Sequence, residues 1–163
     1  MSKDLTPEEA KDVFWETLKD HRTVMMGSDS TRHMQPMTGF GERDEGVIYF
    51  YTRDDTDLAK SLETGGEAMI CLMSKDEKVH ACIAGRAGLT RDREAIDENW
   101  NYFVSAWFPD GKDDPALTLI RFEPADGKVW VQNGGAVRFL FETTKANLTG
   151  EFPNEGDVVN VRF

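Results

Sequence analysis

Short runs of β-forming residues, most of them separated by turns, dominate this chain and indicate an antiparallel sheet. Strands are predicted over residues 23–28, 33–40, 47–52, 68–74, 79–89, 116–123 and 128–132. The turns Lys75-Asp76-Glu77 and Pro124-Ala125-Asp126-Gly127 each predict a hairpin. Pro36 interrupts the second run, which predicts an edge position or a bulge there. Six or seven strands with short inserted helices predict a mainly β antiparallel barrel with flanking helices.

Two helices have clear start signals. Thr6-Pro7-Glu8-Glu9 combines an N-cap, a proline at the first helical position and a glutamate three residues after the cap, so a helix is predicted over 7–20. A second, short helix is predicted over 57–63, capped by Thr56 or Asp55 and ended by Gly65-Gly66.

A third helix is predicted between the last two hairpins. Ile96, Trp100, Phe103, Val104 and Trp107 recur at helical spacing, which places both tryptophans on one face. The prolines and the glycine at 109, 111 and 115 then stop the helix. The C-terminal residues, about 134–163, are predicted to form an extension with a helix over 137–146 and a strand over 158–163. The whole chain, 1–163, is predicted to be one domain.

Composition excludes several classes of partner. The net charge is −11, with 19 basic and 30 acidic residues, so nucleic-acid binding is not expected. No apolar run approaches the roughly 18 residues of a membrane span. The N-terminus has no apolar signal core, and the two cysteines suit free thiols in a reducing compartment, so a cytoplasmic location is predicted.

No metal site is predicted. His80 and Cys82 share a strand face, and Cys71 on the partner strand could lie opposite either, which gives at most three ligands. Structural zinc sites require four. These cysteines are therefore interpreted as core residues, and no catalytic residue can be assigned from the sequence.

The strands around residues 33–52 contain the most suggestive group of side chains. Gln35, Met37, Tyr49 and Tyr51 are predicted to share one face of two neighbouring strands. The following segment, 52–60, enters a helix N-terminus, whose free N–H groups favour an anion. Such a surface suits a planar cofactor with a phosphate tail. An ordinary barrel with ordinary helix caps is the alternative interpretation.

Several short sequence motifs occur in an order along the chain that is characteristic of one family. They are Pro36-Met37, Tyr49-Phe50-Tyr51-Thr52, the apolar strand 68–73, Gly85-Arg86-Ala87, the run W-F-P-D-G-K-D-D-P over 107–115, and V-W-V around Trp130. With them, the chain from about Glu9 to Gly150 resembles the pyridoxamine 5′-phosphate oxidase-like split-barrel flavoproteins, and most of all the general stress protein 26 group. The run over 107–115 is the most specific of these motifs.

The resemblance implies a six-stranded split barrel, a homodimer and a flavin held in the cleft between the subunits. FMN is the expected flavin and FAD the alternative. By this resemblance Gln35, Pro36, Met37, Tyr51 and Thr52 line the isoalloxazine ring. Thr56 and Lys60 face the phosphate, and Trp107 comes from the other subunit.

Two positions depart from the family pattern. Gln35 stands where the family commonly has arginine, and Leu58 stands where lysine is usual, so two phosphate-binding cations are missing. Arg32, Arg53 and Lys60 are the neighbouring cations that could replace them. The leading hypothesis is a stress-associated, FMN-binding protein.

Two rival functions stay open beside a third, heme or F420 binding, which occurs on related barrels and which no feature of this sequence selects. One is a flavin-dependent reductase or oxidase that acts on a small aromatic substrate. The other is a degenerate barrel without FMN that acts as a ligand-binding or structural dimer. Pyridoxamine phosphate oxidation itself is not expected, because no basic substrate-binding motif occurs near the C-terminus.

Overall fold

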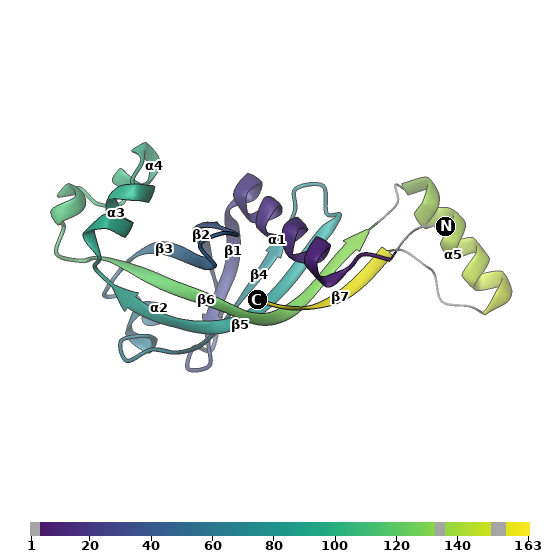
Figure 1. Ribbon diagram of the computed structural model, residues 1–163, viewed down its shortest axis with the longest axis horizontal. Helices are drawn as coiled ribbons and strands as arrows, with labels where there is room; N and C mark the ends of the chain where they lie inside the picture. Colours follow the sequence, from purple (N-terminus) through teal and green to yellow (C-terminus); the bar gives the residue numbers. More distant parts are fainter. Residues whose placement is uncertain (1–3, 133–135, 151–155) are drawn as a thin grey trace.

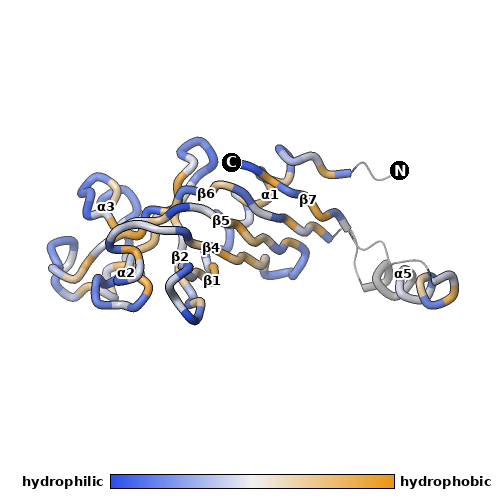
Figure 2. Tube along the Cα trace, turned by 90° about the horizontal axis from the view of Figure 1, so that it is seen from below, coloured by the Kyte–Doolittle hydropathy of each residue, from blue (hydrophilic) through white to orange (hydrophobic). Residues whose placement is uncertain are grey.

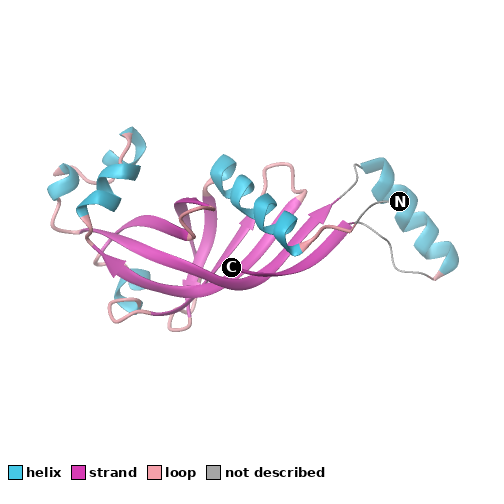
Figure 3. Ribbon diagram, viewed as in Figure 1, coloured by secondary structure: helices cyan, strands magenta, loops and turns pink. Residues whose placement is uncertain are grey.

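The computed structural model describes residues 4–132, 136–150 and 156–163 of the chain. Strands form the body of the molecule, and short helices lie around it (Figure 3). The elements are α1 (Pro7–His21), β1 (Thr23–Ser28), β2 (Gln35–Glu42), β3 (Val47–Arg53), α2 (Asp57–Ser61), β4 (Gly66–Met73), β5 (Val79–Thr90), α3 (Arg93–Asn99), α4 (Tyr102–Ser105), the 3₁₀ turn Gly111–Asp113, β6 (Leu117–Gln132), α5 (Ala136–Thr149) and β7 (Gly156–Arg162).

Six of the strands close into an antiparallel barrel. The sheet order is β3-β2-β1-β4-β5-β6-β7, and β3 also pairs with β6, so that β1 to β6 form a closed ring. β7 is an outer strand, and β6 is its one partner among the described strands. The predicted six-stranded antiparallel barrel is therefore confirmed, and the strong β-forming runs predicted over 47–52 and 79–89 are both barrel strands.

The N-terminal helix forms as its signals predict. The Thr6 hydroxyl accepts a hydrogen bond from the Glu9 amide, and the Glu9 carboxylate accepts one from the Thr6 amide. The helix ends at His21, one residue beyond the predicted boundary, because Arg22 adopts a left-handed conformation with φ 57°. Its buried face packs on the barrel near β2 and β7 (Figure 1).

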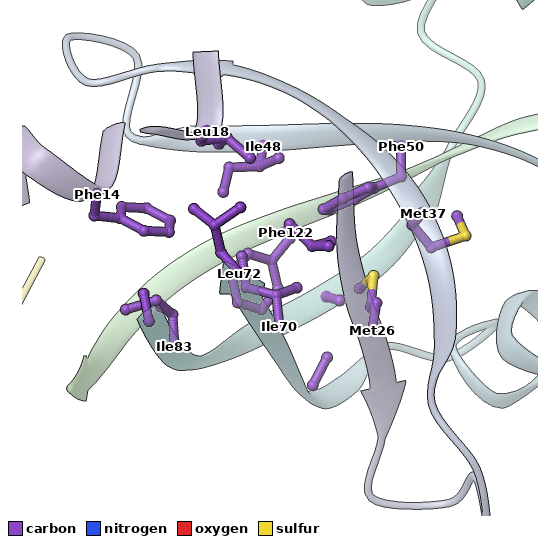
Figure 4. Close-up of a cluster of buried hydrophobic side chains, with 14 of the residues drawn as sticks. Phe14, Leu18, Met26, Met37, Ile48, Phe50, Ile70, Leu72, Ile83 and Phe122 are labelled. Carbon is purple, nitrogen blue, oxygen red and sulfur yellow. The ribbon is translucent and has the colours of Figure 1, made fainter. Parts of the chain in front are cut away.

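The barrel interior is filled by large apolar side chains. Along β4 and β5, buried residues alternate with more exposed ones, and orange segments alternate with paler or blue ones in Figure 2. Figure 4 shows inward-pointing side chains from α1 and from each of the strands β1 to β6, namely Phe14, Leu18, Met26, Met37, Ile48, Phe50, Ile70, Leu72, Ile83 and Phe122. Burial of each contributes about 1.5–3 kcal/mol, so this cluster is the main source of stability.

The prediction of a hairpin around residues 124–127 is wrong. β6 is one continuous strand, and the register with β5 shifts where Gly85 opposes Pro124 and Ala84 opposes Asp126. The turn-forming residues 124–127 stay within the strand and form a β-bulge, in which Ala125 is the extra residue. At this point β6 leaves β3 and begins to pair with β7. The bulge thus marks where the sheet extends beyond the closed barrel.

Pro36 lies at a position of β2 where the hydrogen-bond ladder between strands tolerates a residue without an N–H group. It pairs with β1 through Met25, whereas β3 runs beside β2 only from Gly39 onward. At Pro36 the side of β2 that faces away from β1 is therefore locally unpaired, which is the edge position that the sequence predicts.

The single helix predicted through Trp100 and Trp107 is also wrong. α3 ends at Asn99, Trp100 is extended with ψ 129°, and α4 starts anew after Asn101. The Asn101 side chain accepts hydrogen bonds from the amides of Phe103 and Val104, so it caps a second helix instead of continuing the first.

The C-terminal extension has the two predicted elements, α5 and β7. Residues 133–135, which include the start of this predicted extension, lie outside the described residues. Residues 151–155 lie outside them as well. Figure 1 shows α5 beyond the ends of β6 and β7, away from the barrel. None of the described helices has the length and apolarity that crossing a bilayer requires.

Candidate functional site

The predicted site residues divide between two faces of the β2–β3 sheet. Met37 belongs to the barrel core together with Phe50, and the two lie close together in Figure 4. Tyr49 and Tyr51 instead pack outside the barrel, against a second cluster that includes Phe40. The prediction that Gln35 and Met37 share a face with these tyrosines is therefore wrong. The register explains the difference, because Phe40 opposes Tyr49 and Gly39 opposes Phe50.

On the barrel side, Gln35 and Met37 are in contact. The Gln35 amide nitrogen lies 3.2 Å from the Met37 sulfur, and the Gln35 side chain is half-buried. Pro36 between them is exposed on the opposite side of the strand. This end of β2 therefore offers one polar amide beside a polarizable apolar side chain.

Thr52 and Thr56 are brought together at the end of β3. Thr52 is buried, and its hydroxyl oxygen lies 3.3 Å from that of Thr56. Thr56 caps α2 by accepting a hydrogen bond from the Ala59 amide, and its hydroxyl also donates to the Arg53 carbonyl. The prediction of Thr56 as the cap is confirmed, and α2 ends at Ser61, two residues before its predicted end.

The cationic side chains near α2 differ in whether they form ion pairs. Arg53 forms an ion pair with Asp55 across 3.3 Å. Lys60 is exposed, and within the described ranges neither it nor Arg32 takes part in an ion pair. Leu58, at the position where the resemblance implies a lysine, is only 1% exposed and belongs to the barrel core. Its position is therefore a packing position in this chain.

A pocket of about 340 Å³ lies beside these residues, between the β1–β2 turn and β4. Its lining includes Arg32, Met34, Ala68 and Met69, but none of the predicted site residues. The Ser28 hydroxyl at its edge donates to the Ser61 hydroxyl, 2.8 Å away at the end of α2. The pocket thus adjoins both the start of β2 and the helix that Thr56 caps. Sequence spacing alone could not reveal it, because β1 and β4 become neighbours only in the closed sheet.

Tyr51 has a defined role outside the barrel. Its hydroxyl donates to the Ile96 carbonyl at 2.5 Å, and its ring packs edge-on against Phe40 and Trp100. Burial, with smaller contributions from the carboxylates of Asp97 and Glu98, raises the pKa of Tyr51 to about 12. Tyr51 therefore stays a neutral phenol, and its hydrogen bond to Ile96 holds α3 against the sheet.

This arrangement predicts a late phenol titration. Because the folded-state pKa of Tyr51 lies above its ordinary value of 10, its contribution to stability is full below about pH 10 and is lost as the pH rises toward 12. In a spectrophotometric titration of the three tyrosines, we expect the step at highest pH to disappear in Tyr51→Phe. A Tyr51→Phe profile that keeps this late step would contradict the assignment.

Trp107 follows α4 and lies on the surface of this chain. Its side chain is 78% exposed, whereas Trp100 is half-buried against Tyr51 and Phe108. Tyr102 and Phe103 on α4 are similarly exposed, at 84% and 79%. We call these three side chains the α4 aromatic patch. Single exposed aromatics are common on protein surfaces, but three within six residues are a candidate contact surface.

Comparison with known proteins agrees with the motifs. Residues 9–154 match a family described as pyridoxamine 5′-phosphate oxidase like. General stress protein 26 of Bacillus subtilis (strain 168) is 33% identical to this chain over 107 residues, which make up 64% of this chain and 72% of the relative. The family match over residues 9–154 includes nearly all of α1, all six barrel strands and α5.

Solved structures share the same fold. A protein assigned as general stress protein 26 from Jannaschia sp. CCS1 has 36% identity and a TM-score of 0.79, over 96% of this chain and 99% of that one. The general stress FMN/FAD binding protein from Xanthomonas citri has 34% identity and a TM-score of 0.73, over 78% of this chain and 92% of that one. The family match over most of the chain confirms the resemblance drawn from the motifs, and the protein is a member of the pyridoxamine 5′-phosphate oxidase-like family.

Proposed function

We propose that this protein binds a flavin, FMN in the first place and FAD as the alternative, and acts in a stress response. The observation that carries the proposal is its 34% identity to the general stress FMN/FAD binding protein of Xanthomonas citri at a TM-score of 0.73. A bound flavin would supply reversible one- and two-electron redox chemistry.

The residues near α2 fit a phosphate in part. Thr52 and Thr56 place two hydroxyl groups 3.3 Å apart, and Lys60 on the same short helix is not engaged in an ion pair with any described residue. Arg32 in the adjoining pocket is a second such cation. A hydrogen bond to a charged group contributes about 1.5–3 kcal/mol, so Lys60 and Arg32 can offset the arginine and lysine that Gln35 and Leu58 replace.

The ring would lie against apolar surface next to these groups. Met34 and Met69 line the pocket, and Gln35 begins β2 directly beside it. Pockets for small ligands combine such apolar walls with a few polar groups that fix orientation. We assign Gln35, Pro36, Met37, Thr52, Thr56 and Lys60 to the flavin site, and Tyr51 to supporting it from the outer face of β3.

The main alternative is a barrel that has kept its fold and lost FMN. Its support is the burial of Leu58 in the core together with the neutral Gln35. The two hypotheses differ in the affinity for the phosphate. If Lys60 and Arg32 hold it, FMN should bind at least about tenfold more tightly than riboflavin, which lacks the phosphate.

Parallel fluorescence-quenching titrations with FMN and riboflavin distinguish these hypotheses. Equal affinities would refute the phosphate assignment, and no binding of either flavin would support the alternative. For an enzyme, we expect NADH or NADPH consumption that depends on added flavin, whereas a carrier would show none.

We further propose that the protein is a homodimer in which the α4 aromatic patch contacts the second subunit. Tyr102, Phe103 and Trp107 each leave more than three quarters of their surface exposed in the single chain. Tyrosine and tryptophan are enriched among the side chains that dominate interface energies. By this proposal Trp107 reaches the flavin site of the partner.

Trp107→Ala is expected to weaken dimerisation by about 30-fold, because truncating an interface tryptophan commonly costs 2 kcal/mol or more. The fold should persist, since Trp107 is 78% exposed in the single chain. Sedimentation equilibrium provides the measurement. Leu148→Ala, which truncates an equally exposed apolar residue on α5, serves as the control. Indistinguishable dissociation constants for the two variants would contradict this interface.

A further inference from the structure

The two cysteines of this chain face each other in the sheet. Cys71 on β4 and Cys82 on β5 are directly opposite residues in the β4–β5 register. Their Sγ atoms are 3.2 Å apart, and both cysteines are free thiols. The sequence contains no other cysteine. The fold therefore pairs the only two thiols that the chain has.

We propose that Cys71 and Cys82 form a redox-active dithiol that a hydroperoxide oxidises to an intramolecular disulfide across β4 and β5. Opposite residues of an antiparallel pair have Cα atoms about 4.5–5.5 Å apart, which lies within the usual range for a disulfide. The sulfur atoms need to approach by only about 1.2 Å to reach bonding distance. This inference does not depend on flavin binding.

The surroundings allow an oxidant to reach the pair. Both thiols are only partly buried, on the outer face of the barrel, and Met69 beside them is 43% exposed. The Met69 sulfur lies 3.3 Å from the Cys82 sulfur. Lys128 is the residue directly opposite Cys82 in the β5–β6 register, so a basic residue neighbours the pair. A structural cysteine of the core would lack this access.

The two sulfur atoms have different roles in the oxidation. Burial, assisted by the hydrogen bond with Cys82 and by its charge, raises the pKa of Cys71 to about 12. Cys71 therefore keeps its proton at neutral pH, and Cys82 is the sulfur that attacks first. Its thiolate, formed by loss of the thiol proton to solvent, attacks the terminal oxygen of the hydroperoxide, which breaks the O–O bond and forms a sulfenic acid. The departing hydroxide or alkoxide takes up a proton from solvent and leaves as water or an alcohol. The Cys71 sulfur then attacks the Cys82 sulfur, loses its proton and expels the hydroxyl group as water.

In sum, two thiols and one hydroperoxide give one disulfide and two molecules of water, or water and an alcohol. The protein loses two hydrogens and two electrons, and the peroxide gains them. A dithiol reductant reverses the reaction by thiol–disulfide exchange.

The experiment treats the full chain with hydrogen peroxide under native conditions. We expect loss of both thiols, a mass lower by two hydrogens, a linked peptide pair containing Cys71 and Cys82, and recovery with dithiothreitol. Met69→Leu is the matched control, because it removes the neighbouring thioether and leaves both thiols in place. It should form the same disulfide.

In Cys71→Ser, peroxide should leave Cys82 as a sulfenic acid that dimedone traps. In Cys82→Ser, we expect the remaining thiol to react at least about tenfold more slowly than the wild-type pair, because the neighbouring reactive sulfur is gone. Wild-type protein that keeps both thiols, forms only disulfides between chains, or proceeds to sulfinic acid without a linked peptide would overturn the proposal. These readouts on the wild type hold even if a serine variant fails to fold.

Discussion

Replacing Gly85 with alanine is expected to destabilise the protein by at least about 3 kcal/mol, which corresponds to a fall in Tm of roughly 6–12 °C for a chain of this size. An added Cβ at Gly85 would lie 2.1 Å from the Glu123 carbonyl oxygen and 2.9 Å from the Phe122 ring. The first of these atoms belongs to the backbone of β6, so it cannot rotate away. The variant therefore has to break the pairing of β5 and β6 at the bulge.

Gly88→Ala is the matched control for this prediction. Gly88 lies on the same strand, three residues further on, and the nearest atom to an added Cβ is 3.8 Å away. We expect its Tm to stay close to that of the wild type. Thermal and urea denaturation of both variants provide the measurement. If Gly85→Ala is as stable as Gly88→Ala, the close approach of the two strands at the bulge is refuted.

The second large effect concerns the flavin phosphate. Gln35→Arg is expected to tighten FMN binding by about 10- to 100-fold, because it restores a cation that can form charge-assisted hydrogen bonds of about 1.5–3 kcal/mol. Little is lost in exchange, since the described partner of the Gln35 amide is the weakly accepting sulfur of Met37. Affinity for riboflavin should stay unchanged, because riboflavin carries no phosphate.

Thr38→Arg controls for the added charge. Thr38 is an exposed residue of the same strand, one residue beyond Met37 and therefore on the other face. This variant raises the net charge equally but should leave FMN affinity within about twofold of the wild type, because screening in water weakens distant charges. Equal effects of the two variants, or an equal gain for riboflavin, would show that Gln35 does not face the phosphate.

Local signals in the sequence were sufficient for the elements that depend on local chemistry. The Thr6 and Glu9 side chains satisfy backbone groups within a single turn, so the start of α1 could be predicted to the residue. The turn over 75–77 likewise joins two strands whose pairing is adjacent in sequence. The antiparallel barrel follows from the number of such strands and the shortness of their connections.

Features that depend on tertiary packing were not predictable in the same way. Pro124 and its neighbours are residue types that favour a turn, but pairing with β5 and β7 holds them extended. Asn101 competes as a cap within a stretch whose apolar spacing is helical. Residue identity does not reveal which of these local and tertiary effects prevails.

The candidate site shows the same division. Thr56 was identifiable as a cap, and its contact with Thr52 follows from the short β3–α2 connection. The placement of Met37 and Tyr51 on opposite faces depends on the β2–β3 register, which alternation within each strand does not fix. Leu58 matches a family lysine position in order along the chain, yet only the closed barrel shows that its side chain fills the core.

The most direct test of the central claim is a titration of the wild-type protein with FMN, preceded by a visible absorbance spectrum of the protein purified without added cofactor. Flavin absorbance in the purified protein, or saturable quenching of FMN fluorescence that reaches one flavin per chain, is the result that flavin binding predicts. A colourless protein that leaves FMN fluorescence unchanged even at high micromolar concentration would contradict it. The protein would then be a barrel of this family that has kept its fold without its flavin.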